Sequence, residues 1–540
     1  MIYRPLLLLF LLVLTVMPVR SAVAAPPSPP QPPASGIAAI WSQVIGHQAG
    51  AQTADAFAPP VVEMRFILAG DARTCGEYDI WYRTTAAGTW LKNNEQASER
   101  TKDIGAFQVS ETDFPMTLCR QAMAADWFEA GLSEKGAGFR PVTVWSPVGK
   151  TVTSTVAGGA SVGRRNGRVD QIVMVTLGDT GCRGMPPGSH GRTFQNCATD
   201  WTFPDLMDNA LSVTLDNGEK AEPDLFVHVG DYRYFWENTS PDTMGYWLKD
   251  FLTPAQQALA VAPWALSRGN HETCPASGRH WFGKGWYYLF GDVDWPAQPC
   301  ANLVPTTYFD IGPDGGQDRQ TRHRVVMIDN SNPDNPGPGG KSLKGLFKDA
   351  VRVTLKGRDA YVASTHWVSH IPGIVYMDYC KGQCGGENGQ VLRDVYEAFG
   401  PIDPCRDRGA GTPPCVPSTQ LHGHQHFFQR VRLFADPGNT ATSTVPWAWP
   451  QTYIVGHGGT KADSFSFTPD RCAAGINVPY TDPAEALSGH VWVEKQHGFV
   501  AWRRARDTVS DPAGWAATHY WITPLMASAG DTALPDCVLK

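Results

Sequence analysis

Beyond its first residues, the sequence lacks any apolar run long enough to cross a bilayer. No later stretch reaches the roughly 18 uncharged apolar residues that a membrane helix needs. It also lacks a block of basic residues: 45 Lys and Arg stand against 52 Asp and Glu, a formal net charge of −7. The body of the protein is therefore not expected to span a membrane, and no nucleic-acid partner is expected.

Internal repeats are not evident either, and the length points to a large folded unit. At 540 residues the chain is too long for one simple core, so two domains or one large elaborated domain are expected. Its 54 Gly and 43 Pro predict long loops and argue against an all-helical architecture. The sequence gives no indication of the oligomeric state.

The N-terminus has the pattern of an export signal. Arg4 precedes an apolar run from Leu6 to Met17, and the small residues Ala22 and Ala24 mark a cleavage site. We therefore predict a signal peptide over residues 1–24 and an exported protein, periplasmic or secreted. An uncleaved membrane anchor is the alternative.

The 12 cysteines fit an oxidising compartment. "CKGQC", from Cys380 to Cys384, favours a tight disulfide loop over a zinc site, because no second CxxC-type pair accompanies it. Sequence alone cannot determine the pairing, but proximity suggests four local bridges: Cys75 with Cys119, Cys182 with Cys197, Cys274 with Cys300, and Cys405 with Cys415.

The composition changes along the chain and divides it into segments. Residues 25–59, with "PPSPPQPPASG" at 26–36, are predicted to be a Pro-rich linker. Residues 60–165 contain alternating, β-branched segments and predict a β-sandwich-like N-terminal domain. After a Gly/Arg-rich boundary at 157–168, residues 169–540 form the remaining domain, where short apolar runs end in polar residues.

Five of these apolar runs end in residues that can bind metal. The runs "QIVMVTL", "PDLFVHV", "APWALSR", "RDAYVAST" and "STQLH" are followed by Asp179, Asp231, Asn270, His366, and the pair His424 and His426. In open α/β sheets the carboxyl ends of strands converge at the ligand-binding edge. Any one Gly-Asp or Gly-His pair is better interpreted as a turn, but five in order are not a coincidence.

The donor types indicate the kind of metal. Carboxylates from Asp179 and Asp231, the amide of Asn270, a phenolate from Tyr234 and several imidazoles form a mixed oxygen and nitrogen set. Such a set suits Fe, Zn or Mn rather than Cu(I) or an iron–sulfur cluster. Seven candidate ligands are too many for one tetrahedral zinc and predict two metal ions that share a carboxylate.

The series GDTG, GDYRY, GNHE, STH and GHQH resembles the calcineurin-like metallophosphoesterases, and within them the purple acid phosphatases. Gly181 and Tyr234 stand at the positions that favour this branch. The resemblance covers roughly residues 169–460. It implies an α/β (α+β) fold with a β-sandwich core of two mixed sheets flanked by helices, here preceded by a small all-β domain.

The resemblance also implies the ligands of two ions. Fe(III) would be bound by Asp179, Tyr234 and His426. A divalent ion (Zn, Fe or Mn) would be bound by Asn270, His366 and His424, with Asp231 bridging the two. His271 would lie outside the ligands and face the substrate phosphate.

The sequence departs from the family after His366, where "THWVSHIPG" lacks the additional substrate-facing histidines. His370 is the candidate to replace one of them, and both His271 and His370 are predicted catalytic residues. Arg183 and His457 are weaker candidates for substrate contact, since an exposed Arg and a structural turn are at least as good interpretations. Glu272 is expected to orient the His271 loop.

The resemblance implies hydrolysis of a small phosphomonoester by attack of a metal-bound hydroxide, without a covalent enzyme intermediate. A phosphodiesterase or nucleotide hydrolase is the alternative, because the same metal core serves both. A non-catalytic binding protein on this scaffold would be expected to have lost ligands, and all seven are present. An adhesive cysteine-rich module would not explain polar residues at five strand ends.

Overall fold

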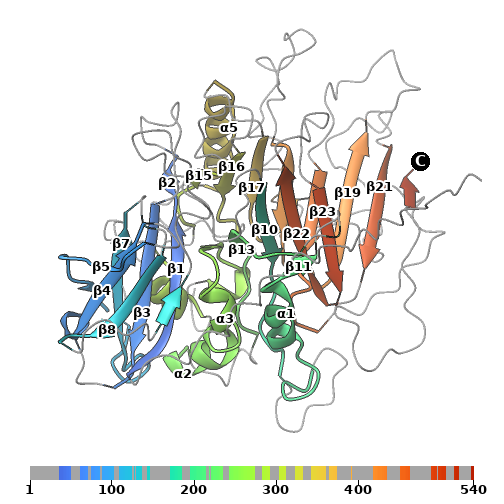
Figure 1. Ribbon diagram of the computed structural model, residues 1–540. Helices are drawn as coiled ribbons and strands as arrows, with labels where there is room; N and C mark the ends of the chain where they lie inside the picture. Colours follow the sequence, from blue (N-terminus) through green and yellow to red (C-terminus); the bar gives the residue numbers. More distant parts are fainter. Residues whose placement is uncertain are drawn as a thin grey trace, which may run out of the picture.

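The computed structural model describes most of the region between residues 36 and 539 (Figure 1). The described residues are 36–49, 61–70, 74–84, 88–102, 109–124, 127, 129–136, 143–145, 171–184, 195–214, 218, 220–234, 242–273, 282–291, 303–311, 323–332, 342–359, 364–373, 391, 417–434, 451–461, 488–494, 497–505, 516–521 and 537–539. The predicted signal peptide, the boundary at 157–168 and the "CKGQC" loop lie outside them.

Two nine-stranded mixed sheets form the centre of the molecule. The first sheet has the order β23 (Ala516–Trp521), β22 (Gly498–Ala505), β10 (Gln171–Leu177), β13 (Leu225–His228), β14 (Trp264–Leu266), β1 (Ile37–Ile45), β3 (Val61–Leu68), β7 (Thr117–Met123) and β6 (Ser98–Glu99). Strands β10, β13, β14 and β1 are parallel, so their carboxyl ends lie at one edge.

The second sheet has a similar parallel centre. Its order is β2 (His47–Gln48), β15 (Thr307–Ile311), β16 (His323–Met327), β17 (Ser364–Val368), β18 (Thr419–His422), β20 (Gln451–Val455), β19 (Phe428–Phe434), β21 (Ser488–Glu494) and β24 (Cys537–Leu539). Strands β16, β17, β18 and β20 are parallel.

The two sheets pack face to face through their apolar side chains. One hydrophobic core joins Met174 and Val227 of the first sheet to Phe309, Val368 and Leu421 of the second. In each strand these residues alternate with others that point to the outer faces, as the two-residue period of a strand requires. The core therefore holds the carboxyl ends of both parallel sets close together.

Helices cover the outer face of each sheet. On the first sheet the outer cluster contains residues of α1 (Phe203–Ala210), α2 (Met244–Trp247), the π-helical turn η4 (Leu248–Leu252), α3 (Gln256–Leu259) and α4 (Gly283–Leu289). On the second, α5 (Leu343–Asp359) packs through Leu346, Phe347 and Val353 against Trp367. The predicted fold, two mixed sheets flanked by helices, is confirmed.

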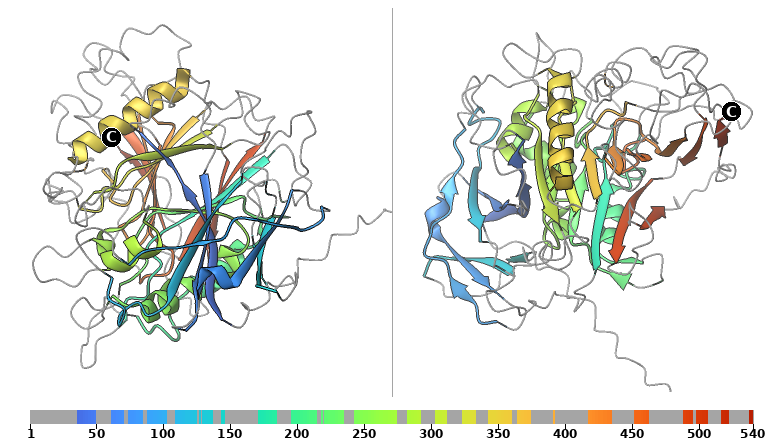
Figure 2. Two further views of the ribbon diagram at one scale, coloured as in Figure 1. Left: turned by 90° about the vertical axis from the view of Figure 1, so that its left-hand side faces the viewer. Right: turned by 90° about the horizontal axis from the view of Figure 1, so that it is seen from above.

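The described residues between 61 and 145 form β-structure, as predicted, apart from one short 3-10 turn, but part of this region belongs to the central sheet. Strands β3 and β7 extend the first sheet, while β4 (Tyr78–Arg83), β5 (Leu91–Lys92), β8 (Glu129–Glu134) and β9 (Thr143–Trp145) form a separate four-stranded sheet. Figures 1 and 2 show these N-terminal strands, in blue, at the side opposite the C-terminal ones. The short turn η2 (Cys75–Glu77) precedes β4, and β11 (Val213–Thr214) pairs with β12 (Lys220–Ala221).

The prediction that residues 25–59 are a linker is wrong for residues 37–48, which contain β1 and β2. Strand β1 is almost fully buried and pairs with β3 on one side and β14 on the other. The reason is the apolar segment "IAAIWSQVI", whose Ile40 lies in the core between the sheets while Trp41 lies in the outer cluster. This strand connects the all-β region to the rest of the first sheet.

Two of the four suggested disulfides are formed, Cys75–Cys119 and Cys182–Cys197. The cysteines of the other two lie outside the described residues. Within the described part of the chain, every helix is too short or too polar to cross a membrane.

Candidate metal centre

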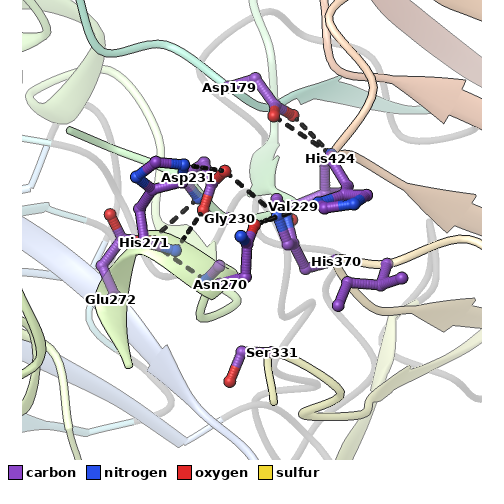
Figure 3. A network of polar contacts seen from close by, with 12 residues as sticks. Asp179, Val229, Gly230, Asp231, Asn270, His271, Glu272, Ser331, His370 and His424 are labelled. Atoms are coloured by element: carbon purple, nitrogen blue, oxygen red, sulfur yellow. Dashed lines mark hydrogen bonds and ion pairs between the residues drawn. The ribbon is translucent and has the colours of Figure 1, made fainter. Parts of the chain in front are cut away.

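The candidate site lies where the carboxyl ends of the parallel strands of both sheets meet. From the first sheet, Asp179 follows β10, Asp231 follows β13 and Asn270 follows β14. From the second sheet, His370 follows β17 and His424 follows β18. Figure 3 shows these five side chains around a common centre. Convergence of strand ends is what the sequence predicted for this edge.

The backbone is strained at this site. Among the described residues, the non-glycine residues with positive φ are Asp179 (56°), Asp231 (58°) and His424 (72°). The left-handed conformation costs a residue with a Cβ about 1–3 kcal/mol and persists only where the surroundings fix it. All three residues are predicted metal ligands, so the strain coincides with the proposed centre.

The two Gly-Asp loops are bonded to each other through their backbones. The N–H of Asp179 donates to the carbonyl of Gly230 at 2.9 Å, and that of Thr180 donates to Asp231 at 3.0 Å. His228, which the sequence analysis missed, braces both loops. Its Nδ1 accepts from the Gly230 N–H, so its Nε2 carries the proton that is donated to the Thr180 hydroxyl at 3.0 Å. Burial lowers the pKa of His228, which fits this neutral ring.

Glu272 joins the second loop to the third. Its carboxylate accepts the backbone N–H groups of Asp231 (3.0 Å), Tyr232 (3.0 Å) and Gly269 (3.1 Å). The N–H of His271 donates in turn to the Asp231 carboxylate at 3.0 Å. Both oxygens of Glu272 are therefore engaged by the backbone, in the orienting role expected for this residue.

Tyr234 lies between the two carboxylates. Its hydroxyl is 2.7 Å from Oδ2 of Asp231 and also contacts Oδ1 of Asp179. Nε2 of His426 lies 3.1 Å from the same hydroxyl and 3.6 Å from Asp179. Asp179, Tyr234 and His426 thus form one group of donors, the three residues expected around Fe(III).

Asn270 is the centre of a second group. Its Oδ1 lies 2.8 Å from Nε2 of His370 and 3.0 Å from Nδ1 of His424. Asp231 belongs to both groups, because its Oδ2 contacts Tyr234 on one side and lies 3.2 Å from Nε2 of His370 on the other. Ligand atoms of Asp179, Asp231 and His370 all lie within 4.8 Å of one another.

The electrostatics of this cluster fit a cation site. Burial raises the pKa of Asp179 to about 7, and His370 only partly offsets this. Burial also acts to raise the pKa of Asp231, but the charges of His370 and His271 lower it overall. Burial opposes charge on His370, yet the Asp231 carboxylate raises its pKa to about 9. Without a cation, a proton on His370 must compensate buried carboxylates, which is the charge that a metal ion would supply.

The structure does not bring His366 to the cluster, which corrects its assignment as a metal ligand. His366 lies inside β17, where its Nε2 contacts the Ser364 hydroxyl at 2.8 Å and its Nδ1 contacts Thr419 at 2.7 Å. The strand continues through the buried residues Trp367 and Val368, so the side chain that emerges at its end is His370. The apolar character of Trp367 and Val368 was the signal in the sequence.

His370 was predicted to face the substrate, and its position corrects that role too. The residue is fully buried, and its Nδ1 lies 2.8 Å from the carbonyl of Val229. A carbonyl can only accept, so Nδ1 carries a proton and Nε2 faces Asp231 and Asn270. This second contact to a backbone carbonyl is typical of histidines that ligate metal.

Asn330 was also missed by the sequence analysis. It follows β16, and its Oδ1 accepts the N–H groups of His370 and Ile371, each at 2.9 Å. Its Nδ2 donates to the carbonyl of Ile371 at 2.6 Å and to the Ser369 hydroxyl at 3.2 Å. One side chain therefore fixes the turn that presents His370.

The residues predicted to contact substrate take different positions. His271 is at the rim, with 19% of its side chain exposed and Nε2 3.9 Å from Asp231. His457 is 1% exposed and packs on Phe428, and its substrate contact stays a prediction. The turn at His457 is structural: the N–H of Gly458 donates to Gly178. Arg183 pairs with Gln195 through its backbone, and substrate contact by its guanidinium stays a prediction.

Comparisons with known proteins found a matching family model and a similar solved structure. The family model described as calcineurin-like phosphoesterase matches residues 176–428. A similar solved structure is the purple acid phosphatase PPD1 isolated from yellow lupin (Lupinus luteus) seeds. It is 11% identical, with a TM-score of 0.45 over 85% of this chain and 72% of that chain. No curated protein matches the sequence.

Proposed function

We propose that this chain is a dinuclear-metal phosphatase of the metallophosphoesterase superfamily and that it acts on phosphomonoesters. The observation that carries the proposal is the convergence of Asp179, Asp231 and His370, whose ligand atoms lie within 4.8 Å of one another. Two of these three have a left-handed backbone, as does the adjacent His424. A polar cluster of this kind, buried and strained, is typical of a functional site rather than of a core.

The donors divide into two sets around Asp231. Asp179, Tyr234 and His426 would hold one ion, for which the phenol of Tyr234 favours Fe(III). Asn270, His370 and His424 would hold a divalent ion (Zn, Fe or Mn), with His370 in place of His366. Asp231 contacts both sets and would bridge the two ions.

When bound, two such cations supply Lewis acidity that activates water and stabilises charge on the phosphoryl oxygens. The residues of the chain do the positioning. Glu272 holds the loops of Asp231 and Asn270 together through three backbone N–H groups. His271, at the rim and partly exposed, is placed to donate a proton to the leaving oxygen or a hydrogen bond to the phosphate.

We also propose that the protein is exported and acts on a small phosphate ester. The export signal predicted over residues 1–24 and the disulfides Cys75–Cys119 and Cys182–Cys197 support an oxidising compartment. The net charge of −7 does not favour a nucleic-acid substrate.

The test is metal analysis combined with a substrate panel. Purified protein should contain two metal ions per chain and show visible absorption from a phenolate bound to Fe(III). It should hydrolyse p-nitrophenyl phosphate faster than bis(p-nitrophenyl) phosphate. A preference for the diester would favour the phosphodiesterase alternative on the same core, and folded protein that takes up no metal would refute the proposed function.

A further inference from the structure

A buried ion pair between Arg268 and Asp329 connects the two sheets beside the cluster. Nη2 of Arg268 lies 2.6 Å from Oδ2 of Asp329, and the side chains are 0% and 2% exposed. Arg268 follows β14 of the first sheet, and Asp329 follows β16 of the second. Burial would lower the pKa of Arg268, but the Asp329 carboxylate raises it overall, so the guanidinium stays charged.

Each partner is also fixed by its own surroundings. Nη1 of Arg268 donates to the hydroxyl of Tyr287 on α4 at 2.7 Å. The carboxylate of Asp329 accepts the N–H of Val304 at 2.7 Å and the N–H and hydroxyl of Ser331 at 3.0 and 2.7 Å. The pair is therefore a rigid connection between the two strand ends rather than two flexible side chains in contact.

The residues that follow each partner lead directly to the cluster. Two positions after Arg268 comes Asn270. The next residue after Asp329 is Asn330, whose Oδ1 accepts the N–H of His370 at 2.9 Å. Nε2 of His370 then lies 2.8 Å from Oδ1 of Asn270. These contacts form a closed ring that passes through both sheets.

We propose that the Arg268–Asp329 pair is a positioning element of the metal centre, which sets the spacing between Asn270 and His370. The inference rests on the proposed function, because that function makes these two residues ligands of the same ion. Neither Arg268 nor Asp329 contacts substrate. Their role is to keep the loop after β14 and the turn after β17 at the separation that one ion requires.

A second buried pair provides a matched control. Arg324 and Asp310 lie opposite each other on β16 and β15, with contacts of 2.7 and 2.9 Å, and both side chains are 0% exposed. Arg324 also donates to the carbonyl of Val353 on α5. Breaking this pair should destabilise the fold as breaking any buried ion pair does, while leaving the spacing of Asn270 and His370 unchanged.

The test compares D329N with D310N in the full-length protein. Both variants should lower the melting temperature of the metal-free protein. On titration of metal-free protein with Zn²⁺, followed by calorimetry, only D329N should weaken one of two binding events, by about 10- to 100-fold, the range typical of residues that orient a metal ligand. The visible absorption of Fe(III)-loaded protein should be retained in D329N. Tyr234 belongs to the set of ligands with Asp179 and His426, which the Arg268–Asp329 pair does not position.

The pair acts only on stability if D329N binds both ions as tightly as the wild type, or if D310N weakens binding equally. A wild type that takes up no ion would instead overturn the proposed function and, with it, the ligand assignment. Should D329N not fold, R268M/D329L, which leaves no unpaired buried charge, is compared with R324M/D310L. The same selective loss is expected, and equal affinities in these two variants would refute the proposal.

Discussion

Nδ1 of His370 donates to the carbonyl of Val229 on the opposite sheet, at 2.8 Å, and this contact directs Nε2 toward Asp231. The two residues join the turn after β17 to the loop after β13. The histidine therefore enters the cluster with a defined tautomer and orientation, which a side chain positioned only by its own strand would not have.

Replacing His370 with Ala should remove one of the two metal ions and reduce phosphatase activity by more than the roughly 10- to 100-fold typical of an outer residue. His366→Gln is the matched control, since His366 lies on the strand that His370 follows and its ring nitrogens contact the hydroxyls of Ser364 and Thr419. That variant should keep both ions and lose about 1–3 kcal/mol of stability. Metal analysis of both variants decides between them, and loss of metal in H366Q alone would restore the original assignment.

Changing Tyr234 to Phe should abolish visible absorption while leaving the fold intact. The phenol is the group in the cluster able to give a phenolate-to-Fe(III) band, and burial raises its pKa well above the ordinary value in the metal-free protein. Loss of its hydroxyl also removes a hydrogen bond of 2.7 Å to Asp231. An absorption spectrum of the iron-loaded variant that matches the wild type would show that Tyr234 is not a ligand.

Gly269→Ala should abolish metal binding. A Cβ at this position would lie 2.0 Å from Oδ1 of Asp231 and 2.2 Å from its backbone N, so the loop must move. Gly245→Ala is the control, because its Cβ would meet nothing within 4 Å and the residue lies in α2. Metal content should fall only in G269A; equal binding by the two variants would mean that this close approach does not determine the site.

Glu272→Gln should destabilise the protein by about 1–3 kcal/mol, because an amide nitrogen cannot accept the backbone N–H that the carboxylate oxygen accepts. Both oxygens are engaged, by Tyr232 on one side and by Asp231 and Gly269 on the other. The measurement is thermal unfolding with and without metal. An orienting role predicts weaker binding together with lower stability, whereas lost activity at unchanged stability and affinity would indicate proton transfer.

Removal of metal should lower the melting temperature. Ions that bind only the folded state stabilise it by about 2.7 kcal/mol at a hundredfold excess over Kd, and here they would also neutralise the buried Asp179 and Asp231. Unfolding followed at increasing Zn²⁺ concentration should give a rising midpoint. A midpoint that does not change with added metal would show that no ion binds at the cluster.

The sequence predicted most of the site because the signals are local. A Gly followed by Asp, Asn or His directly after an apolar run specifies both the turn and the ligand, as at Asp179, Asp231 and Asn270. The assignment of His366 as a ligand was wrong because "STHWVSH" contains two histidines four residues apart. Only the length of the strand decides which of them lies at its carboxyl end. The buried Trp367 and Val368 place that end later.

Other features were not predictable because they depend on contacts between distant segments. The Arg268–Asp329 pair joins residues from different sheets, and nothing near either residue identifies its partner. The segment that forms β1 was predicted as linker because it follows a Pro-rich stretch. Its pairing with β14 depends on a contact between segments far apart in the sequence. Nothing in the sequence around Asn330 indicates its role, which depends on the hydrogen bond that its Oδ1 accepts from the N–H of His370.

The division of the donors between the sheets has a consequence for the order in which the site is assembled. Asp179, Asp231 and Asn270 come from the first sheet, whereas His370, His424 and His426 come from the second and are made later. A chain that ended before residue 417 would retain every oxygen donor and lack His424 and His426. An ion that needs donors from both sheets would therefore be bound only after synthesis has passed residue 426 and the two sheets have docked.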